Sequence, residues 1–124
     1  MSMNELGKRI AFANNSKGFA FTKDEINTKL LLAVSEICEA QEELRDGNEI
    51  TDIYHLGMVG QYHAGASLST FPKDQKPEGF AIEIADAIIR LLHICGNFNI
   101  DIDAIVELKL AYNATRPMKH GRKF

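Results

Sequence analysis

Two acidic pairs with the same spacing are the residues of this chain best suited to do chemistry. Glu36 and Glu39 form one pair, and Glu83 and Asp86 form the other. On a helix, residues three apart lie on one face, one turn from each other. Two antiparallel helices could therefore direct all four carboxylates at one point. An all-oxygen set of ligands suits Mg²⁺, or Mn²⁺ in its place.

The first pair alone is weak support for a site. Glu36, Glu39 and Glu43 fall on an arc of about 60° of a helix that we expect to run to Arg45. Acidic stripes of this kind usually face solvent and serve solubility. A site at this stripe needs a second observation from elsewhere in the chain.

The second acidic pair lies in an apolar segment, so it cannot be explained as a solvent-facing stripe that serves solubility. The segment from Phe80 to Cys95 is apolar almost all the way round a helix. Such a helix is expected to be buried, in its own domain or at a subunit interface. Glu83 and Asp86 stand in its middle, and burying an unpaired charge costs several kcal/mol per ion. Something must compensate for these two charges.

A salt bridge and a metal ion are the two candidate compensations. Arg90 follows Asp86 by four residues and could pair with it, but one arginine cannot neutralise both pairs of acids. A divalent cation could. Zinc and di-iron centres fit less well, because neither Cys38 nor Cys95 has a partner at ligand spacing and neither acidic pair has the Glu-x-x-His form. Both cysteines are expected to be buried, reduced thiols.

Four helices are expected to position these groups. The first should end around residues 14–18, and the second should start at the capping box of Thr22 to Glu25 and end at residues 46–48. The third should start with Pro77 and Glu78 and stop at Gly96, and the fourth should run from its cap, Asp101, to about Thr115. No segment alternates with period two for long enough to demand a strand. The predicted fold is all-α, a four-to-five-helix bundle.

Residues 49–77 are the least regular part of the chain. Glycines at 57, 60 and 65 and a proline at 72 interrupt them, and the apolar residues between 50 and 59 could form one short helix. A long loop in a compact domain is usually functional or mobile. We therefore interpret residues 1–124 as one domain with an inserted loop at about 49–77.

Length and composition exclude several classes of protein. A chain of 124 residues, with 45% hydrophobic and 25% charged residues, is typical of one globular domain. A helical protein this short often completes its core by pairing with a copy of itself, so we expect a homodimer or homotetramer. The net charge of −3 makes a nucleic-acid binder unlikely, although the end of the chain from Arg116 is basic. No apolar run is long enough for a membrane helix and no signal peptide is recognisable, which predicts a cytoplasmic protein.

The acidic pairs and two further stretches resemble one known family. The two motifs read Ser35-Glu36-Ile37-Cys38-Glu39 and Glu83-Ile84-Ala85-Asp86, and the second lies within Pro77-Glu78-Gly79-Phe80-Ala81-Ile82-Glu83-Ile84-Ala85-Asp86. The end reads Lys109…Tyr112-Asn113…Arg116-Pro117…Lys119-His120-Gly121. Over residues 25–48 and 77–122 this resembles the all-α nucleoside triphosphate pyrophosphohydrolases, which include MazG, dimeric dUTPases and phosphoribosyl-ATP pyrophosphatases. Their shared pattern is Glu-Glu-x-x-Glu on one helix and Glu-x-x-Asp on another.

The resemblance implies a fold, an activity and a set of site residues. The fold is a MazG-like bundle, and the activity is Mg²⁺-dependent hydrolysis of a nucleoside triphosphate to a monophosphate and pyrophosphate. Catalytic and metal-binding roles fall on the four acids Glu36, Glu39, Glu83 and Asp86. Contacts with the substrate's phosphates or base fall on Lys109, Asn113, Arg116 and Lys119.

Two departures from the family pattern keep an alternative open. Ser35 stands where the family has its first glutamate, so a contact is lost or is supplied by Glu42 or Glu43. Residues 55–75 form an extra segment relative to the family. The alternative is a non-catalytic helical module for oligomerisation or nucleotide sensing, which binds metal without turnover.

Overall fold

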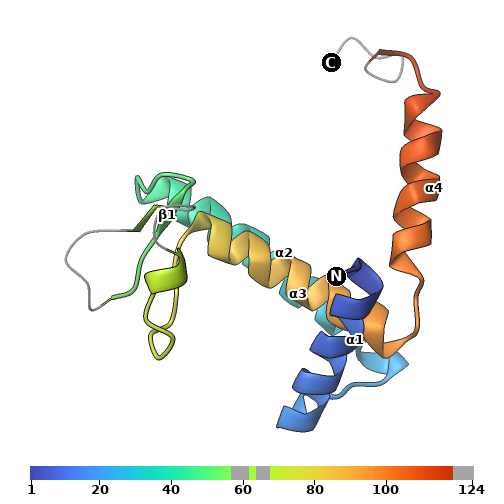
Figure 1. Ribbon diagram of the computed structural model, residues 1–124, viewed down its shortest axis with the longest axis horizontal. Coiled ribbons are helices and arrows are strands. Elements are labelled where there is room, and N and C mark those ends of the chain that lie inside the picture. The colour runs from blue at the N-terminus through green and yellow to red at the C-terminus, as the bar shows by residue number, and fades with distance from the viewer. Residues whose placement is uncertain (57–61, 64–67, 119–124) are drawn as a thin grey trace. The chain divides into compact units, whose positions relative to one another are not determined.

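Helices make up nearly all the regular structure of the part of the chain that the computed structural model describes, which is residues 1–56, 62–63 and 68–118 (Figure 1). The α-helices there are α1 (Met3–Asn14), α2 (Ile26–Arg45), α3 (Phe80–Asn97) and α4 (Ile102–Ala114). Two strands of two residues each, β1 (Asp52–Ile53) and β2 (Tyr62–His63), pair antiparallel. The prediction of an all-α fold is confirmed. None of these helices is long and apolar enough to cross a membrane.

The chain divides into two compact units. The first comprises Met1–Ala20 and Leu92–Phe124, and the second comprises Phe21–Leu91. The first unit therefore contains α1, α4 and the last turns of α3, whereas the second contains α2, the β ladder and the first turns of α3. The single domain over residues 1–124 stays a prediction.

Local capping signals begin and end α2, and begin α4, as predicted. The backbone N–H of Thr22 donates to Oε1 of Glu25 (3.2 Å), which closes the capping box at the short 3-10 turn before α2. Gly47 follows α2 with a φ of 84°, in the left-handed region that favours glycine. Asp101 caps α4, because its Oδ1 accepts a hydrogen bond from the N–H of Ala104 (3.2 Å).

The predicted start of α3 is wrong. Pro77 and Glu78 precede the helix, and Glu78 forms an antiparallel bridge with Tyr54, through backbone N–H···O bonds of 2.7 Å and 3.1 Å. Gly79 then turns the chain into α3 with a φ of 134°. A side chain at Gly79 would collide with the backbone oxygen of Asp52. The pairing with a distant segment therefore overrides the helix-starting tendency of proline and glutamate.

The irregular segment between α2 and α3 also differs from its prediction. Residues 52–53 form strand β1 and not part of a short helix, since their backbone pairs with that of β2. A 3-10 turn follows at Leu68–Thr70. The remaining glycine-rich positions, 57–61 and 64–67, lie outside the described residues.

Gly96 has a different role from the predicted helix stop. It lies inside α3, and a Cβ atom there would collide with the backbone oxygen of Gly7 in α1. A Cβ atom at Gly7 would in turn lie 3.0 Å from the backbone oxygen of Leu92. Two glycines thus let α1 and the end of α3 approach each other closely. The helix continues to Asn97, and the non-glycine residue Asn99 takes the left-handed conformation beyond it.

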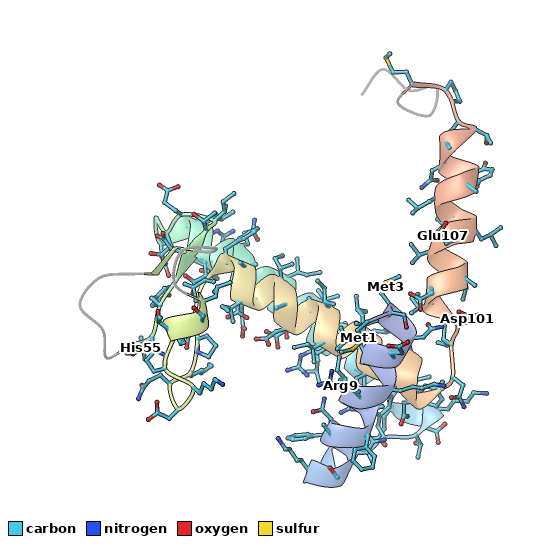
Figure 2. The ribbon with its side chains drawn as sticks, viewed as in Figure 1. Met1, Met3, Arg9, His55, Asp101 and Glu107 are labelled. Atoms are coloured by element: carbon cyan, nitrogen blue, oxygen red, sulfur yellow. The ribbon has the colours of Figure 1, made fainter. Side chains whose placement is uncertain are left out.

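Reciprocal capping joins the starts of α1 and α4 within the first unit. Asp103 accepts hydrogen bonds from the backbone N–H groups of Met3 (3.1 Å) and Asn4 (3.0 Å). Asn4 in return donates to Oδ1 of Asp101 (2.8 Å) and accepts from the N–H of Asp103 (3.2 Å). Met3 and Asp101 lie at this junction in Figure 2. Each aspartate meets free N–H groups at a helix start, where negative charge is favourable.

The buried core of the described residues is small and rich in alanine. Its hydrophobic members are Ala11, Phe21, Ala33, Ala40, Ile53, Ala87, Leu92 and Ile94. Many of the larger aliphatic side chains of α2, and of α3 before Leu92, remain exposed in the single chain; Val34 and Ile37 are 51% and 53% exposed. The buried residues of α2 are therefore two alanines and an acid, Ala33, Ala40 and Glu36.

The two cysteines are free thiols, as predicted, but only one has the predicted burial. Cys95 is half-buried, and burial raises its pKa. Cys38 is exposed. The expectation for Cys38 is wrong because α2 turns its alanine and acid stripe inward and leaves neighbouring apolar positions open to solvent.

We expect Gly96→Ala to destabilise the protein by about 1–3 kcal/mol, the usual cost of overpacking. Without a collision, the same change inside a helix would stabilise it by about 1 kcal/mol, so the sign of the effect is diagnostic. Urea denaturation followed by circular dichroism measures it. Ala85→Ser, at an exposed position of α3, is the control. A stabilised Gly96→Ala variant would contradict the close contact with Gly7.

Candidate metal centre

The acids of α2 are brought to α3 by the alanines around them. Glu36 lies one turn from Ala33 and one turn from Ala40, and all three are buried. Alanine side chains allow two helices to pack closely, so the face that bears Glu36 becomes the inward face. Glu39 lies one turn beyond Glu36 on α2, and its side chain is exposed. One acid of this pair is therefore enclosed and the other reaches solvent.

The acids of α3 meet those of α2 because the helices run antiparallel. Glu36 contacts Arg90, whereas Glu39 lies near Glu83, so the order of contacts reverses along the two helices (Figure 1). Glu83 and Ala87 are buried on the inner face of α3. The predicted antiparallel arrangement is confirmed.

Three of the four predicted ligands converge. Glu36, Glu39 and Glu83 each offer a carboxylate oxygen, and these oxygens lie within 4.8 Å of one another. We call these residues the primary triad. The fourth acid, Asp86, is half-buried and lies outside the triad. Burial raises the pKa of Asp86, and the negative charge of Glu36 raises it further. Asp86 is therefore close enough to the triad to interact with it electrostatically.

Arg90 pairs across the helices instead of along its own helix. Its Nε donates to Oε1 of Glu36 at 2.8 Å, so Arg90 forms an ion pair with Glu36 where the sequence had offered Asp86 as a possible partner. Burial opposes ionisation of Glu36, but hydrogen bonds from Arg90, Glu83 and Glu39, with the Arg90 charge, outweigh it and lower the pKa of Glu36. Arg90 therefore keeps Glu36 ionised and fixes its orientation.

Glu83 is the acid of this cluster whose ionisation is most strongly disfavoured. Burial, carboxyl–carboxyl hydrogen bonds with Glu36 and Glu39, and the charges of Glu39 and Asp86 raise the pKa of Glu83 to about 8. Its Oε2 is buried, with no hydrogen-bond partner among the described residues. A proton shared with the neighbouring carboxylates relieves this repulsion, and a divalent cation would relieve it too. The donor set, carboxylate oxygens alone, suits a hard cation such as Mg²⁺.

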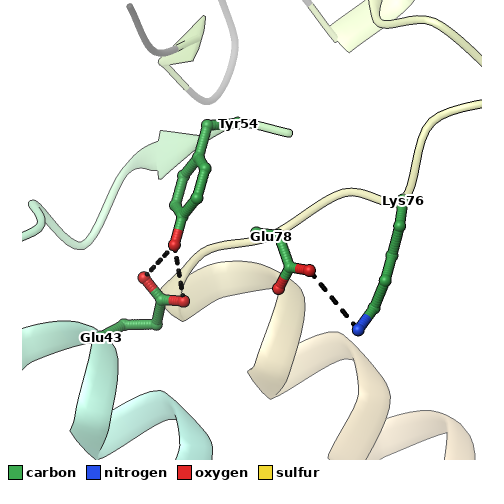
Figure 3. A network of polar contacts seen from close by, with 4 residues as sticks. All are labelled: Glu43, Tyr54, Lys76 and Glu78. Carbon is green, nitrogen blue, oxygen red and sulfur yellow. Dashed lines mark hydrogen bonds and ion pairs between the residues drawn. The ribbon is translucent and has the colours of Figure 1, made fainter. Parts of the chain in front are cut away.

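A second acidic triad adjoins the first. Glu43, Glu78 and Glu83 also offer carboxylate oxygens within 4.8 Å of one another, and we call them the secondary triad. Tyr54 donates its hydroxyl to Glu43 (2.9 Å), and Lys76 pairs with Glu78 at 3.4 Å (Figure 3). Burial, and then the hydrogen bond to Glu43, raise the pKa of Tyr54 to about 12, so Tyr54 stays a donor.

Glu78 is the member of this cluster that sequence reasoning missed. The arc of acids on α2 already contained Glu43, which was considered as a replacement for the family glutamate absent at Ser35. Glu78 was interpreted as part of the first turn of α3. Only its backbone pairing with Tyr54 brings it to the site, and no periodic signal in the sequence indicates that pairing.

Ser35 lies on the exposed side of α2. Its hydroxyl donates to the backbone oxygen of Leu32 at 2.7 Å. Of the two substitutes considered for it, Glu42 is exposed and pairs with Arg45 (2.8 Å), whereas Glu43 belongs to the secondary triad. Glu43 is thus the α2 acid placed to make the additional contact.

The predicted substrate-binding residues lie on and after α4, in the first unit. Lys109 and Asn113 are in α4 and Arg116 follows it. Lys109 Nζ and Arg116 Cζ lie over the ring of Tyr112, 5.2 Å and 5.8 Å from its centroid, so two cations gather at one aromatic side chain. Lys119 lies outside the described residues.

Comparison with known proteins gives no match: no protein-family model, no curated protein and no solved structure matches this chain. The function must therefore be argued from the chain's own residues. The convergence of buried Glu83 with Glu36 and Glu39 is the arrangement from which that argument starts.

We expect the metal-free protein to lose stability as the pH rises from 4.5 to about 8, the interval between the ordinary and the raised pKa of Glu83. Below this interval the carboxyl is protonated in both states. Within it, the unfolded chain releases the proton and the folded chain retains it, so the free energy of unfolding falls with pH. The raised pKa of Asp86 acts in the same direction, whereas the lowered pKa of Glu36 acts below the interval.

Thermal denaturation in the presence of a chelator measures this dependence. Glu83→Gln should remove much of the fall in Tm, because an amide does not ionise. Glu42→Gln, at an exposed acid of α2, should retain it. A Tm that stays level or rises over the interval in the native chain would contradict the assignment.

Proposed function

We propose that this protein is a Mg²⁺-dependent nucleoside triphosphate pyrophosphohydrolase. The observation that carries the proposal is the primary triad: three carboxylates from two antiparallel helices lie within 4.8 Å of one another. One of them is buried, and one of its oxygens has no hydrogen-bond partner among the described residues. The resemblance to the MazG-like family supplies the reaction. Glu36, Glu39 and Glu83 hold the cation, and Asp86 lies close enough to assist.

We assign separate roles in the reaction to the residues around the site. A bound Mg²⁺ ion supplies neutralisation of phosphate charge and acidification of a water molecule. Arg90 keeps Glu36 ionised and oriented toward the site. Asp86, with its raised pKa, is suited to accept a proton from the attacking water. Glu39 is exposed, so the site is open to a triphosphate on that side.

The substrate's remaining negative charge calls for cations of the protein. A Mg-bound triphosphate is still anionic, and the acids repel those phosphate oxygens that no metal binds. We assign the phosphate contacts to Lys109, Arg116 and Lys119, with Asn113 beside them for a phosphate or the base. Lysine acts as a point charge, and arginine can bind two phosphate oxygens at once.

A non-catalytic metal-binding module is the second candidate. The side chain of Ser35 favours it, because its hydroxyl bonds to Leu32 and does not replace the family glutamate as a ligand. The same acids would then bind a cation, or a basic partner, without turnover. The secondary triad favours the enzyme, since Glu43 offers the carboxylate that position 35 lacks.

The test of the enzyme is a panel of NTPs and dNTPs incubated with Mg²⁺, with products separated by chromatography. We expect a monophosphate and pyrophosphate, never a diphosphate and phosphate. Glu83→Gln and Asp86→Asn should abolish turnover in a folded protein, since amides match carboxylates in volume but bind the cation poorly. Glu42→Gln should remain active. No turnover on any substrate, together with intact metal binding, would favour the non-catalytic module.

We further propose that the protein forms a homodimer or homotetramer. The supporting observation is the row of exposed aliphatic side chains on the paired helices, namely Leu30, Val34, Ile37, Leu44, Ile84, Ile88 and Leu91. Exposed apolar side chains gathered on one face often mark an interaction site. A second copy would cover this face while leaving the acidic stripe at the contact of α2 and α3.

Sedimentation at micromolar concentration tests the assembly. We expect a dimer or larger species for the native chain, and dissociation for Ile37→Glu, which places a charge in the apolar row. Thr28→Glu adds the same charge at an exposed position on the other side of α2 and should leave the assembly intact. A native chain that sediments as a monomer would refute the proposal.

A further inference from the structure

An exposed lysine from the segment before α3 reaches the acids of the second unit. Nζ of Lys76 lies 3.4 Å from Oε1 of Glu78 (Figure 3). Glu78 in turn offers a carboxylate oxygen within 4.8 Å of one from the buried Glu83. The charge of Glu78 is the main cause that raises the pKa of Lys76, and the charges of Glu83 and Glu39 add to it. The ammonium group of Lys76 therefore lies in the electrostatic field of both triads.

The contact of Lys76 with Glu78 is of a different kind from the ion pair of Arg90 with Glu36. Arg90 donates at 2.8 Å to a carboxylate that is 9% exposed, so that pair is short and enclosed. The side chain of Lys76 is 83% exposed, and its contact is longer. An exposed pair of this kind contributes little to stability, because water screens it. Lys76 can therefore leave Glu78 for another anion at small cost.

The backbone at Lys76 is held in place while the side chain is free to move. Pro77 restricts the preceding residue, Lys76, to extended conformations. Glu78 is anchored to Tyr54 by two backbone hydrogen bonds of 2.7 Å and 3.1 Å. A lysine side chain carries a compact charge with three donors on a flexible stem of four carbons. Its root is thus fixed beside the acids, and its tip can follow a ligand.

A triphosphate bound at the primary triad would need a cation in this place. The phosphate keeps negative charge when Mg²⁺ is bound, and the acids repel every phosphate oxygen that no metal binds. Lys109 and Arg116 belong to the first unit, whereas Lys76 belongs to the same unit as the acids. Arg90 is already engaged with Glu36. Lys76 is thus a cation that the second unit itself can offer to the substrate.

We propose that Lys76 is a phosphate-binding residue, which pairs with Glu78 in the absence of nucleotide and moves to a phosphate of the bound nucleoside triphosphate. The inference rests on the proposed function, because the triphosphate is the substrate proposed there. Lys76 precedes the stretch that resembles the MazG-like family, so the resemblance gives it no role. A lysine that only held its segment in place would stay on Glu78.

Calorimetric titration of the full-length protein with nucleotide, in the presence of Mg²⁺, tests the phosphate contact. The probes are the non-hydrolysable α,β-imido analogues of dATP, dCTP, dGTP and dUTP. Lys76→Met keeps most of the stem but loses the charge. It should weaken binding roughly tenfold to a hundredfold, the usual effect of losing one charge-assisted contact. Lys76→Arg should retain most of the affinity, and Lys73→Met, at an exposed lysine of the same segment, should bind like the native chain.

Titration with Mn²⁺ alone, followed by electron paramagnetic resonance, separates a phosphate contact from a structural role. Lys76→Met should bind Mn²⁺ more tightly than the native chain, by up to about fivefold, because the ammonium group no longer competes for the acids. The two ligands should therefore respond in opposite directions. Weaker binding of both ligands to Lys76→Met would show that the lysine acts through the fold, and would overturn the proposal.

The outcomes also separate this inference from the proposed function. If the native chain binds an analogue and Lys76→Met binds it equally well, the role of Lys76 is overturned and the proposed function stands. A native chain that binds none of the analogues would overturn both. Circular dichroism checks the fold of each variant, which the replacement of a side chain that is 83% exposed should leave unchanged.

Discussion

The carboxyl group of Glu83, buried between α2 and α3, is the constraint on which the rest of the site depends. Its neighbours one turn away include the buried Ala87 on α3, and Ala33 and Ala40 are buried beside Glu36 on α2. Burial first, and then its hydrogen bonds with Glu36 and Glu39 and the neighbouring charges, raise its pKa to about 8. If Glu83 is ionised in this buried position, a cation must balance its charge. The packing of the two helices thus creates a site that favours a bound cation.

This packing reverses the usual division of a helix into apolar core and polar surface. On α2 the acid and alanine stripe turns inward, while Val34 and Ile37 point to solvent. A single chain thereby gains a preorganised acidic site and loses part of its hydrophobic stabilisation. The same exposed residues then supply a surface on which a second copy could complete the core. Both proposals, the cation site and the assembly of copies, therefore depend on which face of α2 packs against α3.

Features governed by neighbours within one or two helical turns were predictable from the sequence. The capping box at Thr22 and the cap at Asp101 depend on hydrogen bonds across three residues, and both are present. The i, i+3 spacing put each acidic pair on one face, so three of the four predicted ligands converge. Of the predicted substrate contacts, Lys109 and Arg116 share the ring of Tyr112, and their binding role stays a prediction.

Features that depend on residues far apart in the chain were decided by the tertiary structure. Periodicity placed Glu36, Glu39 and Glu43 on one arc of α2 but could not tell whether this arc meets α3 or faces solvent, since that depends on how two distant helices pack. Arg90 pairs with Glu36 of the neighbouring helix and not with Asp86 of its own helix. This partner depends on the packing of α2 against α3. The pairing of Tyr54 with Glu78 and the contact of Gly96 with Gly7 likewise join distant segments. A sequence determines local geometry through short-range hydrogen bonds and sterics, whereas these contacts exist only after the chain has closed long loops and packed its helices.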